Sequence, residues 1–556
     1  MHAPPSQRGA RHESGVQSKF VALLFVLGVS ITALTLRIAF ALTESTGSAM
    51  DARTVTSLSS PVGLDTMAPH TFRSHATSKH YAPDASAHVD ADGHDVVPAK
   101  RHVVGAPAKS SARGLDDADF AEETDSPATP PNTPATQQPT PPPLCYEAHA
   151  FYYPWYGSRA IDGKWRHWDH PYLPHWEKEV TDRYPKGRHD PDHGDVGASF
   201  YPVLGPYSSA DNATIDQHLD WFVRGGIGVL VFSWYPPHMA DENGAPSDCL
   251  VPVLLDRMAP KGIKLAFHSE PYGSRTEVTL KHDITYIVDT YGDHPALYRA
   301  GPENRPVIYV YDAYHVKMER WADVFGRVGG AGRSSGRHDS IRGTRYDVIA
   351  IALMLHIDDD EAYMTVGGFD GVYNYFASRT FTEASNWERW GAISGSAGSH
   401  GRVFVPSIGP GYDDLQVRPW NAENVQERAH GGNYNNSFRQ ATDAVRNEKR
   451  RGLADDLKWV SITSFNEWHE GTQIEPASTK RAGVHSTFAN FEYKRYGTPV
   501  GWPGPPRPQS ASFSGVVGAS ATVDAKGDGF DPYFYLDLTR HWLFHAPGAV
   551  CATERD

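Results

Sequence analysis

Two glutamates in the stretch SFNEWHEGTQIEPA, residues 464–477, have the types and spacing for acid–base chemistry. Glu467 and Glu470 stand three residues apart, just after the apolar run WVSIT, with Trp468 and His469 between them. Such a pair can cleave a glycosidic bond, because one carboxyl protonates the leaving oxygen while the other acts as base or nucleophile. Burial and mutual repulsion can keep one of the two protonated. Acids at this spacing are also common in solvated loops, so the surrounding elements must decide between a site and a surface.

Eight short apolar runs recur along the chain, and each is followed by polar residues and an amphipathic segment such as 214–226. Runs this apolar are typical of parallel strands buried on both faces. Eight strand-then-helix units predict an α/β fold, a (β/α)8 TIM barrel, over residues 144–546. An open doubly wound sheet is the alternative, but no glycine-rich phosphate loop follows an early strand. The runs are 148–156, 227–235, 263–272, 306–312, 348–354, 368–377, 402–410 and 459–468.

The ends of these runs carry aromatic, amide and acidic residues, and active sites of barrels lie at the C-terminal ends of the strands. Aromatic rings stack on sugars while acids and amides bind hydroxyl groups, so the set predicts a carbohydrate ligand, although any one aromatic residue could simply pack. The segment EWHEG lacks the two-histidine spacing of a zinc helix, so we expect neither a metal nor a cofactor. The residues are Tyr152, Tyr153, Trp155, Tyr156, Trp234, Tyr235, His268, Glu270, Tyr272, Asp312, Tyr373, Asn374, Tyr375, Glu467 and Glu470.

The N-terminal quarter of the chain differs from the rest in composition. The uncharged run within 20–42 follows a basic segment, 1–19, which predicts a transmembrane signal-anchor with a cytosolic tail. A cleaved signal peptide is the alternative, favoured by the small-residue pattern at 39–41. Residues 43–143 are rich in Pro, Ser and Thr without sustained periodicity, which predicts a disordered stem. Residues 547–556 are expected to form a C-terminal tail.

The cysteine content argues against a disulfide scaffold, and the charge argues against a protein that binds nucleic acid. Three cysteines are too few for a disulfide scaffold, and Cys249 is one of them. Cys145 and Cys551 flank the expected domain and could either pair in an oxidising lumen or remain free and buried. The net charge of −14 shows no basic stripe, which argues against nucleic acid as a partner. We expect the membrane, through the anchor, and a glycan as partners of a monomeric catalytic domain.

The folded part contains several ordered motifs, which are AFYYPWYG, FYPVLGPYSS, FSWYPPHMADENGAPSDCLVP, FHSEPY, GFDGVYNYFA, PSIGPGYDD, VRPWN and ITSFNEWHEGTQIEPA. These motifs resemble glycoside hydrolase family 99, and the resemblance spans about residues 147–546. It implies retaining endo-α-1,2-mannosidase activity on glucosylated high-mannose N-glycans of glycoproteins, with release of a glucosyl-mannose oligosaccharide. It also implies a single-pass type II protein of the Golgi membrane with a luminal catalytic domain.

The resemblance implies separate roles for the two acids. Glu467 would assist the sugar's own 2-hydroxyl in attacking the anomeric carbon, giving a 1,2-anhydro sugar, and Glu470 would be general acid and then base. Glu475 has no such role and is interpreted as structural, while the loop at 241–244 is expected to cap the glucose-binding end. The expected substrate-binding residues are Tyr152, Trp234, Tyr235, Glu270, Tyr373, Arg418, Asn421 and Asn466.

Two other functions stay open on the sequence. A catalytically inactive glycan-binding homologue would keep the aromatic strand ends but lose an acid, whereas both Glu467 and Glu470 are present. An endo-α-1,2-mannanase acting on mannan would share the catalytic motif. The WYPP and DENG segments and the expected anchor favour the glycoprotein-processing activity.

Overall fold

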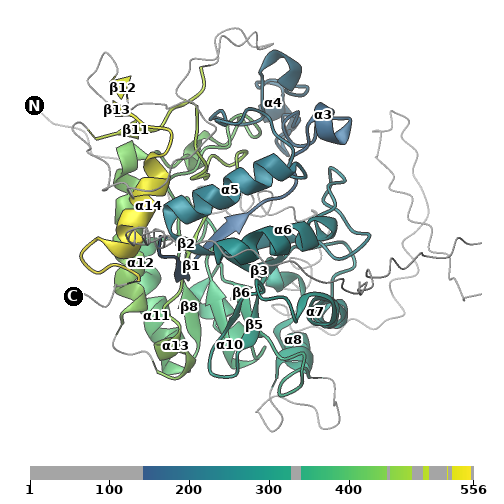
Figure 1. The fold of residues 1–556 in the computed structure, drawn as a ribbon, viewed down its shortest axis with the longest axis vertical. Helices are drawn as coiled ribbons and strands as arrows, with labels where there is room; N and C mark the ends of the chain where they lie inside the picture. Colours follow the sequence, from purple (N-terminus) through teal and green to yellow (C-terminus); the bar gives the residue numbers. More distant parts are fainter. Residues whose placement is uncertain are drawn as a thin grey trace, which may run out of the picture. The chain divides into compact units, whose positions relative to one another are not determined.

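The central element is a parallel sheet that curves back on itself to form a barrel (Figure 1). The computed structural model describes residues 142–326, 340–447, 451–478, 492–499, 522–523 and 529–551. The expected cytosolic tail and signal-anchor, and all but the end of the expected stem, lie outside these ranges. Within the described ranges, no helix combines the length and apolar composition that crossing a bilayer requires.

Each of the eight expected runs contains a strand, and all eight pair in parallel, which confirms the (β/α)8 barrel. The seventh run is split at Pro406 into two short strands, one pairing with the sixth strand and the other with the eighth, so that it closes the barrel. The barrel strands are β1 (Cys145–Tyr152), β2 (Ile227–Trp234), β3 (Lys264–Ser269), β5 (Arg305–Val310), β6 (Ile349–Leu353), β7 (Gly371–Tyr373), β8 (Val403–Val405), β9 (Ser407–Ile408) and β10 (Val460–Ile462).

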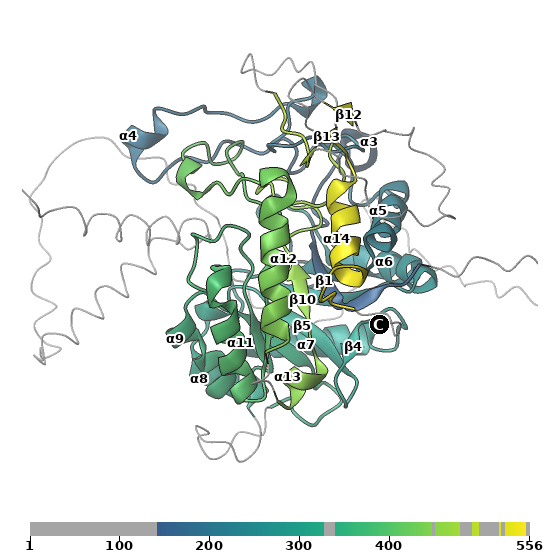
Figure 2. The same cartoon turned by 90° about the vertical axis from the view of Figure 1, so that its left-hand side faces the viewer.

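Helices surround the barrel strands (Figures 1 and 2). The first of them begins after Asp211, whose side chain accepts from the Ala213 amide, and ends at Gly226, whose φ of 73° favours glycine. The last, α14, lies between α12 and α5 and so completes the ring of helices (Figure 2). The main helices are α5 (Asn212–Gly225), α6 (Val251–Met258), α7 (Glu277–Tyr291), α8 (Met318–Phe325), α10 (Ala362–Thr365), α11 (Trp390–Ser399), α12 (Gly432–Val445) and α14 (Phe534–Phe544).

Shorter elements lie at the two ends of the barrel. Helices α3 and α4 follow β1 and lie at the C-terminal ends of the strands, whereas α13 lies at the opposite end (Figure 2). Strand β4 pairs antiparallel with β5, and β11, β13 and β12 form a separate small antiparallel sheet. These elements are α3 (Arg159–Asp162), α4 (Lys178–Thr181), α9 (Ile357–Asp360), α13 (Leu453–Asp456), β4 (Arg299–Ala300), β11 (Gly497–Thr498), β12 (Thr522–Val523) and β13 (Gly529–Phe530).

The barrel interior contains aromatic and histidine side chains in place of the usual branched aliphatic layers. His149 Nδ1 hydrogen-bonds the Tyr309 hydroxyl at 2.6 Å, and His268 Nε2 hydrogen-bonds the Tyr373 hydroxyl at 2.7 Å. The Phe151 ring packs among them, 4.8 Å from His268 and 5.6 Å from Tyr373. Hydrogen bonding within this column satisfies the buried polar groups and leads upward to the C-terminal ends of the strands.

A disulfide joins the start of the domain to its end. Cys145 in β1 pairs with Cys551, which follows α14, and Cys249 is an exposed free thiol. The sequence left pairing and free thiols as equal alternatives, and the structure adopts the pairing. The segment between α14 and Cys551 is also held by a hydrogen bond from Arg446 to the Ala549 carbonyl at 2.7 Å.

Candidate active site

The segment that follows β10 is a buried, internally bonded loop. The Phe465 amide donates to the Phe151 carbonyl at 2.8 Å, and the Glu475 amide donates back to the Phe465 carbonyl at 2.8 Å. The Glu467 amide donates to Ser464 Oγ at 2.7 Å, and the Asp413 amide donates to the Glu470 carbonyl at 2.8 Å. The stretch is therefore fixed at the C-terminal end of a barrel strand, which excludes the interpretation as a solvated acidic loop.

Burial opposes ionisation of both acids of the pair. It raises the pKa of Glu467 well above its usual range, and the charge of Glu470 raises it further, whereas the His469 amide and the Arg418 guanidinium lower it. For Glu470, burial raises the pKa to about 7; Arg418 opposes the shift and Asp414 adds to it. Two interacting carboxyls in this environment can hold one proton between them near neutral pH, which is the state that a general acid and a base together require.

Arg418 and Asn421 both bind a buried carboxylate, Asp414, and Arg418 also contacts Glu470 of the pair. Arg418 Nη1 lies 3.8 Å from Glu470 Oε1 and 3.1 Å from Asp414 Oδ2. Asn421 Nδ2 and the Tyr412 hydroxyl donate to the same Oδ2 at 2.9 Å and 2.8 Å. Of the two expected substrate-binding residues, Arg418 thus lies beside Glu470, and Asn421 shares the carboxylate of Asp414 with it. Asp414 and Tyr412 were part of the motif PSIGPGYDD, but no spacing in the sequence singled them out.

A third carboxylate, Glu270 at the end of β3, lies on the same side of the barrel. Its Oε1 accepts from Ser233 Oγ at 2.8 Å and hydrogen-bonds His268 Nδ1 at 3.0 Å, so that Tyr373 lies behind it through His268. Burial raises the pKa of the Tyr375 phenol well above its usual range, and the charges of Glu470, Glu467 and Glu270 raise it further. The charges of all three acids therefore act on one phenol.

Of the remaining expected substrate-binding residues, Tyr235 lies at the site and three others have structural contacts. Tyr235 is half-buried, and its pKa is raised by burial and then by the charge of Glu270. Tyr152 points outward from the barrel, with its hydroxyl 3.0 Å from His218 Nδ1 on α5. Trp234 is fully buried and donates to Asp248 Oδ1 at 2.9 Å. The Asn466 amide is bonded to both the amide and the carbonyl of Tyr153, at 2.7 Å and 2.9 Å.

Glu475 is a buried carboxylate that hydrogen-bonds side chains in and around the loop of the acid pair. One carboxylate oxygen accepts from the Tyr207 hydroxyl and from Trp468 Nε1, both at 2.8 Å, and the other lies 3.3 Å from His218 Nε2. The side chain is fully buried. These contacts agree with the interpretation of Glu475 as structural.

The loop at 241–244 is closed by hydrogen bonds of its own acid. Asp241 Oδ1 accepts from the amides of Asn243 and Ala245, and Oδ2 lies 2.6 Å from His167 Nε2. His167 stacks on Trp155 with ring centroids 4.6 Å apart. The loop is thus fastened to the aromatic strand end that follows β1. Sequence reasoning did not identify His167, because the two histidines of HWDHP, His167 and His170, do not have a spacing that marks a site.

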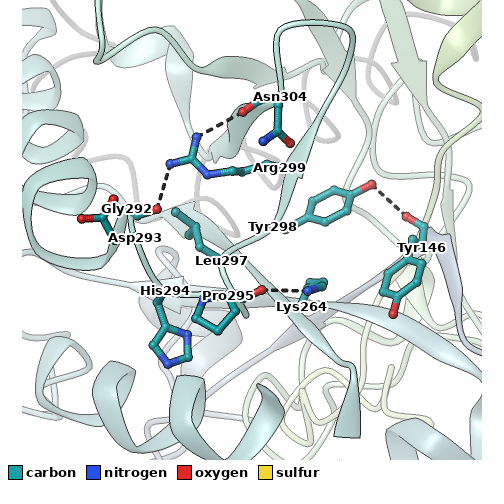
Figure 3. A pocket seen from close by; sticks show the side chains of 10 residues that line it. All are labelled: Tyr146, Lys264, Gly292, Asp293, His294, Pro295, Leu297, Tyr298, Arg299 and Asn304. Carbon is teal, nitrogen blue, oxygen red and sulfur yellow. Dashed lines mark hydrogen bonds between the residues drawn. The ribbon is translucent and has the colours of Figure 1, made fainter. Parts of the chain in front are cut away.

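A separate hollow of about 580 Å³ opens at the opposite end of the barrel, where β1 and β3 begin (Figure 3). Its cations already bind backbone carbonyls: Lys264 Nζ donates to Pro295 at 2.7 Å, and Arg299 donates to Gly292 and Asn304. The hollow is remote from the acid pair, because β10 ends at the other face. Its lining consists of Tyr146, Lys264, Gly292, Asp293, His294, Pro295, Leu297, Tyr298, Arg299 and Asn304.

Comparisons with known proteins agree with this site. A glycoprotein endo-alpha-1,2-mannosidase of Rattus norvegicus is 42% identical over 344 residues, which cover 61% of this chain and 70% of the relative. A glycoprotein endo-alpha-1,2-mannosidase-like protein of Homo sapiens is 45% identical over 341 residues, covering 60% and 69%. The solved GH99 endo-alpha-mannosidase from Bacteroides thetaiotaomicron is 32% identical with a TM-score of 0.56, and the match covers 72% of this chain and 97% of that one.

The model of one family matches most of the folded domain. The match runs over residues 143–498, which is more than half of the chain, and includes the strands β1 to β10 with the acid pair. Fold, site and relatives therefore agree that the chain is a glycoside hydrolase, and that it belongs to glycosyl hydrolase family 99.

Proposed function

We propose that this protein is a retaining endo-α-1,2-mannosidase that cleaves the internal α-1,2 mannosidic bond of glucosylated high-mannose N-glycans and releases a glucosyl-mannose oligosaccharide. The observation that carries the proposal is the buried, mutually interacting pair Glu467 and Glu470 at the end of β10, in a member of family 99. The relatives named endo-alpha-1,2-mannosidase support the choice of bond.

In the first step Glu467 removes the proton from the 2-hydroxyl of the mannose whose bond is cleaved. The oxygen O2 attacks the anomeric carbon, the bond to the leaving oxygen breaks, and Glu470 gives its proton to that oxygen. In an α-mannoside O2 and the leaving oxygen are trans and can become diaxial, so O2 is aligned for attack from the back. The product is a 1,2-anhydro sugar, and no protein atom needs to serve as the nucleophile.

In the second step water opens the anhydro sugar. Glu470, now a carboxylate, removes a proton from water as it attacks the anomeric carbon, and Glu467 returns a proton to O2. Two inversions at the same carbon give net retention. Burial raises the pKa of both acids, and that of Glu467 further, so the first step requires the shared proton to lie on Glu470 when the sugar binds.

The neighbouring residues have supporting roles in the proposal. Arg418 and Asn421 bind hydroxyls of the sugar beside Glu470, and Glu270 and Tyr235 bind the sugar from the side of β2 and β3. The bonds that hold the loop at 241–244 to His167 support its role as a cap over the glucose end. For location we propose a single-pass type II protein of the Golgi membrane with a luminal domain, on the basis of the basic and apolar N-terminal residues.

The test uses the full chain in detergent with a monoglucosylated high-mannose glycan and, separately, unglucosylated mannan. We expect release of a glucosyl-mannose product from the glycan only. Glu467→Gln and Glu470→Gln should each lower turnover by about 10²- to 10⁴-fold, as general acid–base groups do. Glu423→Gln, at an exposed glutamate, is the matched control. Turnover within a factor of ten of the wild type in either folded variant would contradict the assignment, and preferred cleavage of mannan would indicate the mannanase activity.

A further inference from the structure

Asp414 is a buried carboxylate that makes no contact of its own with Glu467 or Glu470 but lies behind Arg418. Its Oδ2 accepts from three donors, the Tyr412 hydroxyl, Asn421 Nδ2 and Arg418 Nη1. Its Oδ1 is buried and has no hydrogen-bond partner among the described residues. A proton on Oδ1 would lack an acceptor, and a proton on Oδ2 would displace a donor. Burial raises the pKa of this carboxyl, whereas the charge of Arg418 and the three donors lower it. The three donors on Oδ2 favour the ionised form.

Arg418 is shared between this carboxylate and Glu470. The same nitrogen, Nη1, lies 3.1 Å from Asp414 Oδ2 and 3.8 Å from Glu470 Oε1. The backbone fixes the arrangement, because the Arg418 amide donates to the Asp414 carbonyl at 2.7 Å. The shorter contact identifies Asp414, and not Glu470, as the principal counter-ion of the guanidinium.

This sharing matters because a lone cation would act against a general acid. A guanidinium within about 4–6 Å stabilises a carboxylate and lowers its pKa by about one to three units. Beside Glu470, an uncompensated Arg418 would therefore favour the ionised form, which cannot protonate the leaving oxygen. Arg418 would nevertheless have to remain at this position if it binds the sugar.

We propose that Asp414 is a positioning residue that holds Arg418 and Asn421 at the site while cancelling the charge of Arg418 at Glu470, so that Glu470 retains the proton it must deliver. The inference rests on the proposed role of Glu470 as general acid. Asp414 touches neither the sugar nor the reacting atoms in this account.

The other groups facing Glu470 do not supply this compensation. Glu467 is a second carboxylate whose ionisation is itself part of the reaction. The phenols stay neutral near pH 7, because burial raises the pKa of each well above its usual range. Asp414 is therefore the group whose charge opposes Arg418: Arg418 lowers the pKa of Glu470, and Asp414 raises it. The facing groups are Glu467 on the same loop, Arg418, Asp414 and Tyr412 on the loop after β9, Tyr311 after β5 and Tyr375 after β7.

The experiment is the pH profile of kcat/KM for Asp414→Asn in the full chain, with a monoglucosylated high-mannose glycan as substrate. Removing the charge of Asp414 removes a repulsion on Glu470 and leaves Arg418 uncompensated, and both changes lower the pKa of Glu470. The basic limb of the profile should move to lower pH by about one unit or more. Asp413→Asn is the matched control. This neighbouring acid pairs with Lys494, so the basic limb of the variant's pH profile should stay in place.

Asp414→Asn leaves a buried guanidinium without its partner and could misfold. A second pair of variants keeps the proposal testable in that case. Arg418→Gln should move the basic limb to higher pH, and the double variant, which removes both charges, should return it to within about half a unit of the wild type. A limb unmoved in folded Asp414→Asn, or unmoved in Arg418→Gln, would overturn the proposal. Failure of the proposed function would look different, because the basic limb would then persist in Glu470→Gln.

Discussion

A buried cation, Arg428, holds the loop that carries the acid pair, and replacing this cation tests how the loop is held. Arg428 lies in the segment between β9 and α12 and is 8% exposed. Its Nη2 donates to the carbonyls of Gly471 and Gln473, at 2.9 Å and 2.7 Å, both in the loop that carries the acid pair. We predict that Arg428→Met destabilises the domain.

The magnitude follows from the contacts that are lost. The guanidinium lies over three rings, with distances of 4.5 Å to Phe200, 4.8 Å to Tyr496 and 4.6 Å to Tyr535. Hydrogen bonds from a charged group contribute about 1.5–3 kcal/mol each, and a desolvated cation–π contact about 2 kcal/mol. Gln473 keeps a partner, since the Tyr496 hydroxyl also donates to its carbonyl at 3.2 Å. Removal of a charge that is costly to bury offsets part of the loss, so the net expectation is about 3 kcal/mol.

The assay is urea unfolding of the full chain followed by tryptophan fluorescence, with the free energy of unfolding taken from midpoint and slope. Arg379→Met is the matched control: Arg379 lies 4.8 Å over Trp387 but is 39% exposed, so we expect a loss of less than about 1 kcal/mol. A loss below about 1 kcal/mol for Arg428→Met would refute the reasoning that this cation anchors the loop.

Three further predictions concern the site. Glu475→Gln should lower the free energy of unfolding by about 1–3 kcal/mol, measured by urea unfolding, because the Tyr207 and Trp468 donors lose a charged acceptor; an unchanged midpoint would contradict its structural role. Tyr152→Phe should leave KM unchanged while Tyr235→Phe raises it, because the Tyr152 hydroxyl bonds His218 outside the barrel; a raised KM for Tyr152→Phe would return Tyr152 to the binding site. The wild-type kcat/KM should fall as pH rises above about 7, because Glu470, with its pKa raised to about 7, then loses the proton that it donates; a flat profile between about pH 5 and about pH 9, two units on either side of that value, would contradict this.

The barrel was predictable because its strands are long apolar runs separated by turns and amphipathic segments. Because these runs are apolar along their whole length, the sequence does not show which side chains face inward. In β1, where nearly every residue is buried, no alternation of polar and apolar residues shows that Phe151 faces the interior while Tyr152 faces α5. Trp234 is a similar case: the sequence places it at a strand end without giving its direction, and the structure buries it with its indole nitrogen bonded to Asp248.

The acid pair was predictable from its position at the end of the last strand. The residues that hold the pair and its neighbours in place were not predictable. Asp413 and Asp414 are adjacent and identical in type, yet one pairs with Lys494 and the other with Arg418. Their partners lie at different distances along the chain, and the conformation of the loop after β9 determines which partner each aspartate meets. Likewise, Asn466 next to Glu467 suggested a substrate contact, but its amide is occupied by the Tyr153 backbone. Contacts between residues far apart in sequence decide such cases.

The most direct measurement of the central claim is proton NMR of the products as they form from a monoglucosylated high-mannose glycan. We predict that the first released species is a glucosyl-mannose disaccharide whose reducing-end mannose is the α anomer, which then equilibrates with the β anomer. Initial appearance of the β anomer, or release of free glucose or mannose in place of the disaccharide, would contradict it.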